Sequence, residues 1–239
     1  MEGIPKYITI LREPAAQIES HMNFFNHRER VMKGIKLFTK HPSKFENGGK
    51  AASRNNQISD LGLMLNKTSN ETTVNATIIK LDKEFDLVLI AECFDESLLL
   101  LKRILRWSFD DILYLIKNQR MHRETITDEF RQQIYQWSRA DVLLYQYFNG
   151  TLWRRVQQYG PQFEDDLVYF RRYLHEINRR CGTSETVVKR FNKLKKIEYN
   201  SKNGSIFCQH LAYSNMDWYK HIAARQDPSG TTKTHLSHH

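Results

Sequence analysis

The stretch Phe85-Asp-Leu-Val-Leu-Ile-Ala91 carries a continuous apolar run between polar neighbours. Such a run is typical of a parallel strand that is covered on both faces. A second apolar stretch, Tyr7-Ile-Thr-Ile-Leu11, is rich in β-branched residues and also predicts a strand. Helical spacing follows from Pro14 to Phe25, and proline suits the first turn of a helix because its missing N–H has no partner there. These residues predict a strand, a turn and a helix.

Between the two strands the sequence predicts a helix over Val31–Thr39 and two polar loops, over Ser43–Ser59 and Met64–Thr77. After the second strand, an acidic first turn at Asp95 begins a predicted helix that ends near Trp107. Strand, helix, long excursion, strand and helix in this order predict an α/β fold with a parallel sheet. Ligands in such sheets bind at the carboxyl ends of the strands.

The C-terminal half is predicted to be rich in helix. Asp110–Ile116 reads as a short strand or an extended edge, and two long amphipathic helices are expected over Thr127–Gln146 and Thr151–Arg180. Thr127 is a candidate cap, because the two residues after it are acidic. A basic helix is expected over Lys189–Lys196.

The formal net charge of +9 favours anionic partners such as nucleic acid, acidic lipid or a phosphate-bearing small molecule. The basic residues are scattered, and their modest clusters are not interleaved with aromatic residues as in an RNA-binding strand. We therefore interpret the charge as solvated helix faces and a small anionic ligand, and we expect no nucleic-acid partner. The cysteines and histidines lack metal-ligand spacing, so we expect no metal.

The three cysteines are Cys93, Cys181 and Cys208. An odd, low count predicts no disulfide framework, and it leaves open which pair, if any, forms a bridge. Cys93 follows a hydrophobic run, which favours a packed core thiol.

Five Asn-X-Ser/Thr sequons indicate a lumenal protein of the secretory pathway with glycosylated surface loops. They begin at Asn66, Asn70, Asn75, Asn149 and Asn203. The longest apolar runs are too short to cross a bilayer. Lumenal sequons without a targeting segment lead us to expect a missing N-terminal part.

Arg12 follows the first predicted strand, and Ser20 lies eight residues later, about two turns into the predicted helix. Because helical side chains lean toward the helix N-terminus, both residues are expected to reach the same region. A terminal phosphate there would gain a guanidinium fork, a hydroxyl donor and helix N-terminal amides. The alternative is an ordinary arginine paired with Glu13 or Glu19 and a serine that faces solvent.

Several blocks, in order over roughly residues 4 to 181, resemble the galactose-3-O-sulfotransferase family. Ile10-Leu-Arg-Glu-Pro14, together with Glu19-Ser20, resembles the phosphate-binding segment of the family. Arg54-Asn55, together with Asp60-Leu-Gly62, resembles a second segment of the family. The most specific block is Phe85–Leu98, which ends in Phe94-Asp-Glu-Ser-Leu98, and Trp107, Asp111–Tyr114, Tyr147–Asn149 and Trp153-Arg154 continue in register. Cys93 stands where the family has an aromatic residue, and His21 where it has a small one.

The resemblance implies a P-loop-NTPase-like sulfotransferase fold, here lacking its N-terminal strand and phosphate loop, with a helix-rich C-terminal half. It places the C-terminal part of a sulfotransferase domain at 1–181, followed by a helical extension at 182–226 and a disordered tail at 227–239. It implies that Arg12 and Ser20 bind the 3′-phosphate of the sulfate donor 3′-phosphoadenylyl sulfate (PAPS), and that the catalytic base lies upstream of Met1. The family also implies a single-pass type II Golgi membrane protein, anchored by a missing N-terminal segment.

Two classes of function follow. The first is an enzyme that transfers sulfate to the 3-hydroxyl of a terminal galactose on a glycolipid or a glycoprotein glycan, although this chain alone is expected to be inactive. The alternative is an inactive fragment or paralogue that binds a glycan or a partner. Glu92, after the second strand, is either an acceptor contact or a structural carboxylate. Aromatic residues at helical spacing favour core packing over sugar platforms; they are Tyr135, Trp137, Tyr145, Tyr147 and Phe148.

Overall fold

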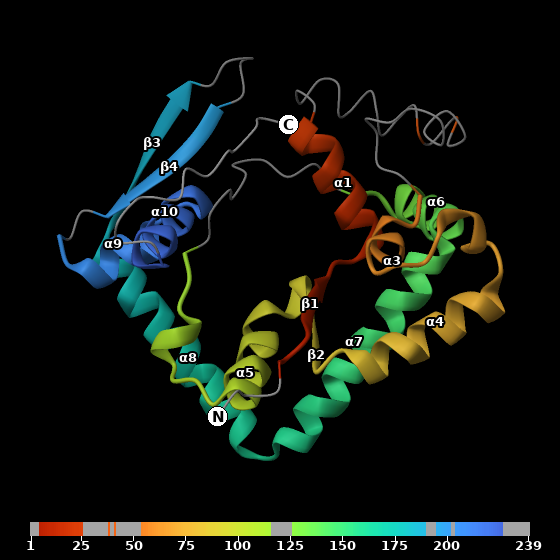
Figure 1. Ribbon diagram of the computed structural model, residues 1–239, viewed down its shortest axis with the longest axis horizontal. Helices are drawn as coiled ribbons and strands as arrows, with labels where there is room; N and C mark the ends of the chain where they lie inside the picture. Colours follow the sequence, from red (N-terminus) through yellow and green to blue (C-terminus); the bar gives the residue numbers. More distant parts are fainter. Residues whose placement is uncertain are drawn as a thin grey trace. The chain divides into compact units, whose positions relative to one another are not determined.

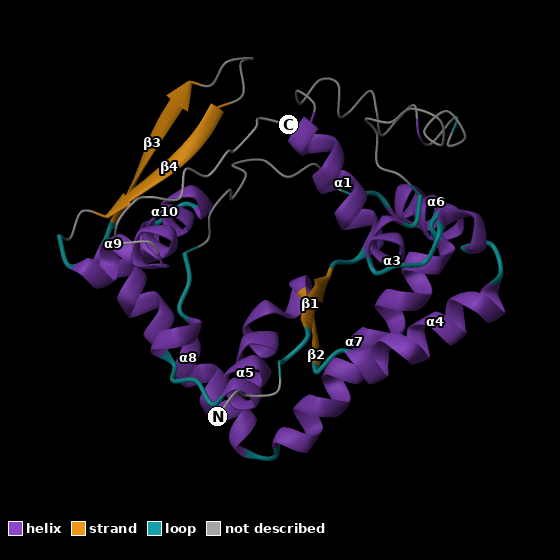
Figure 2. Cartoon of the chain, viewed as in Figure 1, coloured by secondary structure: helices purple, strands orange, loops and turns teal. Residues whose placement is uncertain are grey.

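The computed structural model describes residues 5–25, 38, 41, 54–115, 126–189, 195–201 and 204–226. Within these residues the chain is an α/β protein with a small parallel sheet and a mostly helical remainder (Figures 1 and 2). It divides into two compact units. The first comprises residues 1–108 and 122–167, and the second comprises 109–121 and 168–239.

The parallel sheet confirms both predicted strands. Strand β1 (Ile8–Leu11) pairs in parallel with β2 (Leu87–Ile90), and Leu11 lies opposite Ile90. All four residues of β2 are buried, as expected for a strand covered on both faces. Asp86 connects the strand starts, because its carboxylate accepts hydrogen bonds from the Tyr7 N–H at 2.9 Å and from Lys6 Nζ at 2.7 Å.

Helices cover the sheet. Helix α1 (Pro14–Phe25) follows β1 with the predicted bounds, and α5 (Phe94–Leu105) follows a short 3₁₀ turn after β2. Helices α5 and α7 (Arg139–Tyr159) both pack against β2. The buried Ser97 hydroxyl accepts the Ile90 N–H at 3.0 Å, which joins the end of β2 to the first turn of α5.

The two loops expected between the strands are partly helical where the structure describes them. Helix α3 spans Asn56–Asp60, and helix α4 spans Glu71–Glu84. Asn70 caps α4 by accepting the Thr73 N–H at 3.0 Å, and Val74, Ile78 and Leu81 form its buried face. This i, i+4, i+7 pattern within polar sequence was the missed helix signal. The expected helix over residues 31–39 lies outside the described residues except for Phe38.

The predicted long helices exist, but their ends differ. Helix α6 spans Asp128–Trp137, α7 begins directly after it, and α8 spans Gln162–Cys181. Thr127 caps α6 as predicted, since its hydroxyl accepts the Phe130 N–H at 3.2 Å. The α6–α7 break falls at Ser138, eight residues before the predicted one, because this buried serine is held by contacts that are distant in sequence. Gly160, at φ 94°, separates α7 from α8.

A compact apolar cluster joins α1 to α6 in the first unit. Its buried members are Ala15, Ile18, Phe38, Phe130, Ile134 and Trp137. Phe38 meets Phe130 and Trp137 edge-on, with ring centroids 5.6 and 5.0 Å apart. This cluster holds the helix that follows β1 and thereby fixes the residues between them.

The second unit contains an antiparallel hairpin where we expected a basic helix. Strand β3 (Thr183–Lys189) pairs with β4 (Lys195–Ser201), so the helix prediction over 189–196 was wrong at Lys189, Lys195 and Lys196, and residues 190–194 lie outside the described residues. The β-branched residues Thr186, Val187 and Val188 favour a strand over a helix. Helices α9 (Ile206–Ala212) and α10 (Asn215–Gln226) follow.

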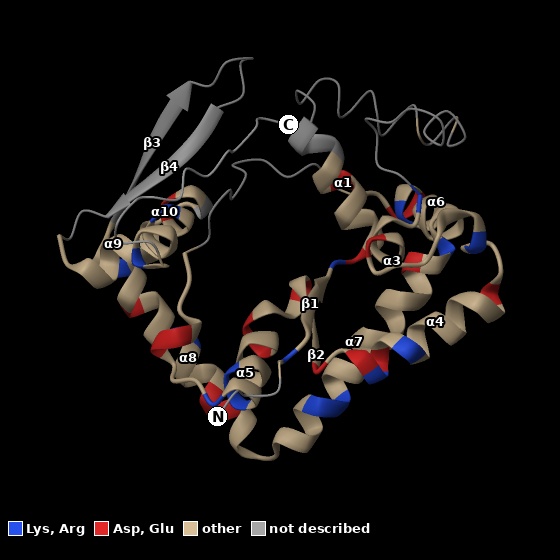
Figure 3. Ribbon diagram, viewed as in Figure 1, with Lys and Arg blue, Asp and Glu red and all other residues tan. Residues whose placement is uncertain are grey.

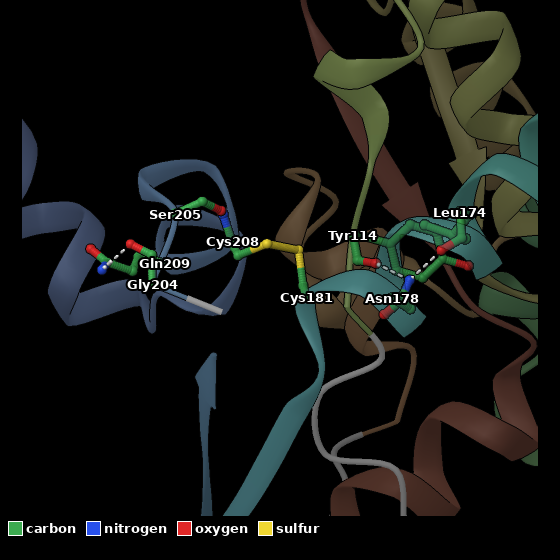
Figure 4. The surroundings of a disulfide bond; sticks show 8 residues. All are labelled: Tyr114, Leu174, Asn178, Cys181, Gly204, Ser205, Cys208 and Gln209. Carbon is green, nitrogen blue, oxygen red and sulfur yellow. Dashed lines mark hydrogen bonds between the residues drawn. A yellow bond between two sulfur atoms is a disulfide. The ribbon is translucent and has the colours of Figure 1, made fainter. Parts of the chain in front are cut away.

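Cys181 and Cys208 form a disulfide that links the end of α8 to α9 (Figure 4), which settles the pairing that the sequence left open. Cys93 is a free, partly buried thiol. Residues 110–112 form a 3₁₀ turn, not the strand that was one of the predicted readings, because Asp110 and Asp111 begin a turn that buries only Ile112. The predicted tail at 227–239 lies outside the described residues. Among the described helices, none combines the length and the apolar character needed to cross a membrane.

Candidate functional site

Arg12 lies directly after β1, at the carboxyl end of the parallel sheet. The Gln57 side chain fixes its backbone from 45 residues away: Gln57 Oε1 accepts the Arg12 N–H at 2.8 Å, and Gln57 Nε2 donates to the Arg12 carbonyl oxygen at 2.8 Å. One buried amide thus satisfies both backbone groups of Arg12, as a neighbouring strand would. The arginine side chain consequently starts from a fixed position at the sheet edge.

Gln57 is itself fixed by reciprocal capping between α3 and α7. The Asp141 carboxylate accepts the N–H groups of Gln57 and Ile58 at 3.2 and 2.9 Å. In the other direction, Asn55 Oδ1 accepts the N–H groups of Ala140 and Asp141 at 3.1 and 3.2 Å. Asn55 is 1% exposed and adopts a left-handed backbone (φ 55°), which asparagine tolerates better than most residues.

The Asp141 carboxylate is buried, and its pKa is perturbed as a result. Burial raises the pKa of Asp141 to about 6, although the N–H groups of Ile58 and Gln57 act in the opposite direction; the Asp60 carboxylate raises it further. The side chain is 4% exposed. Among the described residues no cation pairs with Asp141, so its hydrogen bonds stabilise the buried carboxylate and the network depends on them.

Two carboxylates accompany Arg12 at the sheet edge. Glu92 lies 3.9 Å from the Arg12 Nε, and its Oε1 accepts the Glu13 N–H at 3.1 Å. The Glu13 carboxylate accepts the N–H groups of Ala15 and Ala16 at 3.1 and 2.7 Å. Two of the helix N-terminal amides that we expected to be available to a phosphate are therefore occupied by Glu13.

Two tyrosines complete this cluster. The Tyr145 hydroxyl donates to Glu92 Oε2 at 3.3 Å, and burial together with the Glu92 charge raises the pKa of Tyr145 far above its usual value. Burial and a hydrogen bond to Glu13 raise the pKa of Tyr135 to about 12. Both phenols therefore stay protonated at neutral pH and act as hydrogen-bond donors to the two carboxylates. Glu92 has structural partners here, as one of its two interpretations predicted.

Arg12 and Asp60 both line a cleft of about 350 Å³. The residues that line it include Ile10, Arg12, Gln17, Gln57 and Ala91. Within the described part of the chain, the terminal guanidinium nitrogens of Arg12 have no recorded partner, since its ion pair with Glu92 runs through Nε. Ser20 lies on α1 with intermediate exposure and does not line this cleft. The structure records no contact between Ser20 and Arg12 among the described residues.

The remaining candidate residues are spread over the surface and the core. Four sequon asparagines are described: Asn66 and Asn75 are exposed, Asn70 caps α4, and Asn149 is half-buried on α7; Asn203 lies outside the described residues. Trp137 and Phe148 are buried, which confirms the core interpretation for these two. In the described ranges, no group of histidine, cysteine or acidic residues has the arrangement of a metal site. Basic and acidic residues are scattered over the described helices (Figure 3).

A guanidinium beside a cleft at the carboxyl end of a parallel strand defines an α/β protein with a candidate anion-binding site. The family model for galactose-3-O-sulfotransferase matches residues 3–215. The chain belongs to this family, and the resemblance seen in its motifs is confirmed.

Curated relatives agree with this assignment. Galactose-3-O-sulfotransferase 3 of Mus musculus is 32% identical over 197 residues, covering 77% of this chain and 46% of the relative. Galactose-3-O-sulfotransferase 2 of Homo sapiens is 34% identical, covering 65% and 42%, and human galactosylceramide sulfotransferase is 34% identical, covering 65% and 40%. The chain thus spans less than half the length of these relatives. No solved structure matches it significantly.

Gln57, Asn55 and Asp141 form the support of the site, and sequence reasoning did not assign them a role. The segment that contains Arg54, Asn55 and Asp60 was recognised as a family block, but not as the support of Arg12. Its only local signal is a run of polar residues between apolar ones. The contacts through which this segment supports Arg12 join residues that lie more than 40 positions apart in the sequence.

Proposed function

We propose that this chain carries the 3′-phosphate-binding part of a sulfotransferase that uses PAPS as its donor. The acceptor would be the 3-hydroxyl of a terminal galactose on a glycolipid or a glycoprotein glycan. The observation that carries the proposal is the position of Arg12: its backbone is held by Gln57 through two hydrogen bonds of 2.8 Å, and the residue lines the cleft. The proposed protein is a lumenal Golgi enzyme with a P-loop-like fold, held in the membrane by a segment upstream of Met1.

The chemistry is an in-line displacement. The acceptor oxygen forms a bond to the donor sulfur while the bond between sulfur and the bridging oxygen breaks, and adenosine 3′,5′-bisphosphate leaves. The acceptor proton passes to a base, which we place upstream of Met1. In this scheme Arg12 offers its two terminal nitrogens to the 3′-phosphate and Ser20 offers its hydroxyl. Both residues orient the donor and take no proton.

The separation of Arg12 from the carboxylates matters for this role. Glu92 approaches only the inner nitrogen of Arg12, at 3.9 Å, while Tyr145 and the Glu13 N–H hold the Glu92 carboxylate in place. This arrangement orients the guanidinium without occupying the fork that binds a phosphate in bidentate fashion. Glu92 would thus position Arg12 and have no direct role in sulfate transfer.

Calorimetry with adenosine 3′,5′-bisphosphate tests the proposal in a form of the protein that includes its upstream sequence. Arg12→Ala should weaken binding by about 1.5–3 kcal/mol, the range for hydrogen bonds to charged groups. Arg179→Ala is the matched control, because it removes the same charge from a surface pair with Glu176 on α8. Unchanged affinity in Arg12→Ala, or an equal loss in both variants, would reject Arg12 as the phosphate ligand.

An activity assay separates the enzyme from the alternative of an inactive binding module. The longer form should transfer labelled sulfate from PAPS to galactosylceramide or to a galactose-terminated oligosaccharide. The 239-residue chain should show no transfer, because holding the 3′-phosphate binds donor and transition state about equally. Robust transfer by the 239-residue chain would show that its own residues supply the base.

A further inference from the structure

The first unit contains a second pocket, of about 380 Å³, at the end of α5 and the junction of α7 and α8; we call it the basic pocket. Its lining consists of Lys102, Arg103, Arg106, Trp107, Tyr159 and Gln162. The described residues that line it include no Asp or Glu. Glu164 and Asp165, in the first turn of α8, do not line the pocket. The lining is therefore positively charged.

The basic pocket lies at the opposite edge of the parallel sheet from Arg12. Helix α5 starts beyond the carboxyl end of β2 and packs back along that strand, so its last residues reach the amino edge (Figure 1). On α7, Arg155 lies one turn before Tyr159 and donates to the carbonyl oxygen of Asp86, the residue directly before β2. The basic pocket and the cleft beside Arg12 share no lining residue. This pocket is thus separate from the proposed donor site.

The Arg103 guanidinium is held in place on a packed aromatic ring. Its Nη1 donates to the Tyr159 carbonyl oxygen at 3.0 Å, and its central carbon lies 4.6 Å from the centroid of the Tyr159 ring. The Tyr159 hydroxyl in turn donates to Asp166, and its ring meets Phe163 edge-on with centroids 5.4 Å apart. The bond to the carbonyl uses one of the five N–H groups of the guanidinium. Arg103 is therefore oriented while keeping donors for a ligand.

Arg106 occupies a backbone position that normally suits glycine. It ends α5 in the left-handed conformation, at φ 55°, where a Cβ is strained. The Trp107 N–H closes the helix on the Lys102 carbonyl oxygen at 2.9 Å, a contact that needs no side chain at position 106. The Arg106 side chain is exposed, and within the described ranges no contact is recorded for it. Strain without a structural return is typical of a residue kept for a ligand.

We propose that the basic pocket binds the phosphate group of a phosphate ester. Arg103 and Arg106 donate to the phosphate oxygens, because a planar guanidinium fork matches their geometry. Trp107, which is 44% exposed, packs against the apolar part of the ester. The ester is the headgroup of an acidic lipid or a small soluble compound, since both present the same group. The site uses none of the residues of the Arg12 cleft, so either proposal can fail without the other.

Two measurements on the 239-residue chain test the site and distinguish the two sources. Sedimentation with vesicles of phosphatidylcholine, with and without phosphatidic acid, measures binding to a lipid headgroup. Calorimetry with glycerol 3-phosphate measures binding of a soluble ester. We expect retention on the vesicles that contain phosphatidic acid, because an exposed tryptophan beside cationic residues suits a membrane surface. Binding of glycerol 3-phosphate without such retention would identify a soluble ligand, and binding in neither measurement would overturn the proposal.

Arg106→Gly is the decisive variant, because it removes the charge and suits the left-handed backbone. Binding should fall roughly tenfold, the lower end of the range for a hydrogen bond to a charged group. The thermal midpoint should not fall, because glycine relieves the backbone strain, so unfolding would not account for the lost binding. Arg225→Ala is the matched control, since it removes the same charge from an exposed position on α10.

Two comparisons separate the basic pocket from general charge effects and from the donor site. Arg225→Ala and Arg12→Ala should both bind the phosphate probe as well as the unsubstituted chain does. Full binding by Arg106→Gly would overturn the proposal. An equal loss in Arg225→Ala would show a general effect of charge, and an equal loss in Arg12→Ala would place the phosphate in the other cleft; each of these results would also reject the site.

Discussion

Replacement of the buried carboxylate in Asp141→Asn should change how the stability of the protein depends on pH. The pKa of Asp141 is about 6 in the folded protein, against an ordinary value of 3.8. A difference of about 2 pKa units corresponds to roughly 3 kcal/mol. Burial is the main cause, and it outweighs the two hydrogen bonds from the Gln57 and Ile58 N–H groups.

The direction follows from proton binding. Because the folded state holds the Asp141 proton more tightly than the unfolded state, the contribution of Asp141 to the free energy of unfolding is highest below about pH 4. It falls as the pH rises through the window from about 4 to 6, and about 2 of the roughly 3 kcal/mol are lost between pH 4.5 and 7.5. The amide in Asp141→Asn does not titrate, so the variant should lack this part of the decline.

Urea unfolding at a series of pH values, for both proteins, measures the effect as a difference curve. The advantage of the unsubstituted chain over Asp141→Asn should shrink by about 2 kcal/mol from pH 4.5 to 7.5. Gln57 and Ile58 donate to different oxygens of Asp141, and the amide replaces one of these oxygens by an NH2 group, which adds a pH-independent cost of about 1–3 kcal/mol. A flat difference curve, or one that rises with pH, would show that the hydrogen bonds at the start of α3 outweigh burial.

Three further predictions concern the support of the two units. Gln57→Leu removes both contacts to the Arg12 backbone and should weaken binding of adenosine 3′,5′-bisphosphate roughly five- to tenfold in calorimetry; unchanged affinity would contradict the support role. Loss of the disulfide, with a sequence separation of 27, should lower the free energy of unfolding by about 3–4 kcal/mol in urea titrations without reductant. Asn70→Gln and Thr72→Ala each abolish the sequon at Asn70, so glycosidase digestion should show the loss of one glycan in either variant. Only Asn70→Gln removes the α4 cap, and thermal unfolding should show that this variant alone is less stable, by about 1 kcal/mol in the free energy of unfolding.

The parts of the fold that the sequence predicted are those with a strong local pattern. The apolar run at Leu87–Ile90 has no alternative to a buried strand, and Pro14 marks the start of α1. In both cases the residues within one element determine its type. The order of elements then predicts the parallel pairing, because the long connection between the strands excludes a tight antiparallel hairpin.

The errors fall where a local pattern admits two answers. The segment that begins α4 is rich in Asn and Thr, which favours a loop, yet Val74, Ile78 and Leu81 bury a helical face against α7. At Lys189 and Lys195 the charge pattern suggested a helix face, while backbone pairing between β3 and β4 determines a hairpin. Tertiary packing decides such segments, and intrinsic propensity is only a weak guide.

In the candidate site, too, the sequence predicted the residue with a local pattern and missed the residues that depend on distant contacts. Arg12 was identifiable because its place after a strand is a local feature, and its residue type suits a phosphate. Its support was not identifiable, because Gln57 reaches Arg12 over 45 residues and Asp141 reaches Ile58 over 83. From the sequence alone, a Gln or Asp that becomes buried cannot be distinguished from a polar residue in a loop. This explains why Arg12 was predicted as a candidate and the residues that hold its backbone were not.

The support of Arg12 has a physical consequence for the proposed enzyme. One chain of contacts runs from Asp141 to the backbone at Gln57 and from the Gln57 side chain to the Arg12 backbone. Because Asp141 reaches Arg12 through Gln57, substitutions at Asp141 and Gln57 should be strongly non-additive in donor binding. The double variant should bind adenosine 3′,5′-bisphosphate about as weakly as the worse single variant. Additive losses in a double-mutant cycle would mean that the two residues support the site independently, and this chain of contacts would then be rejected.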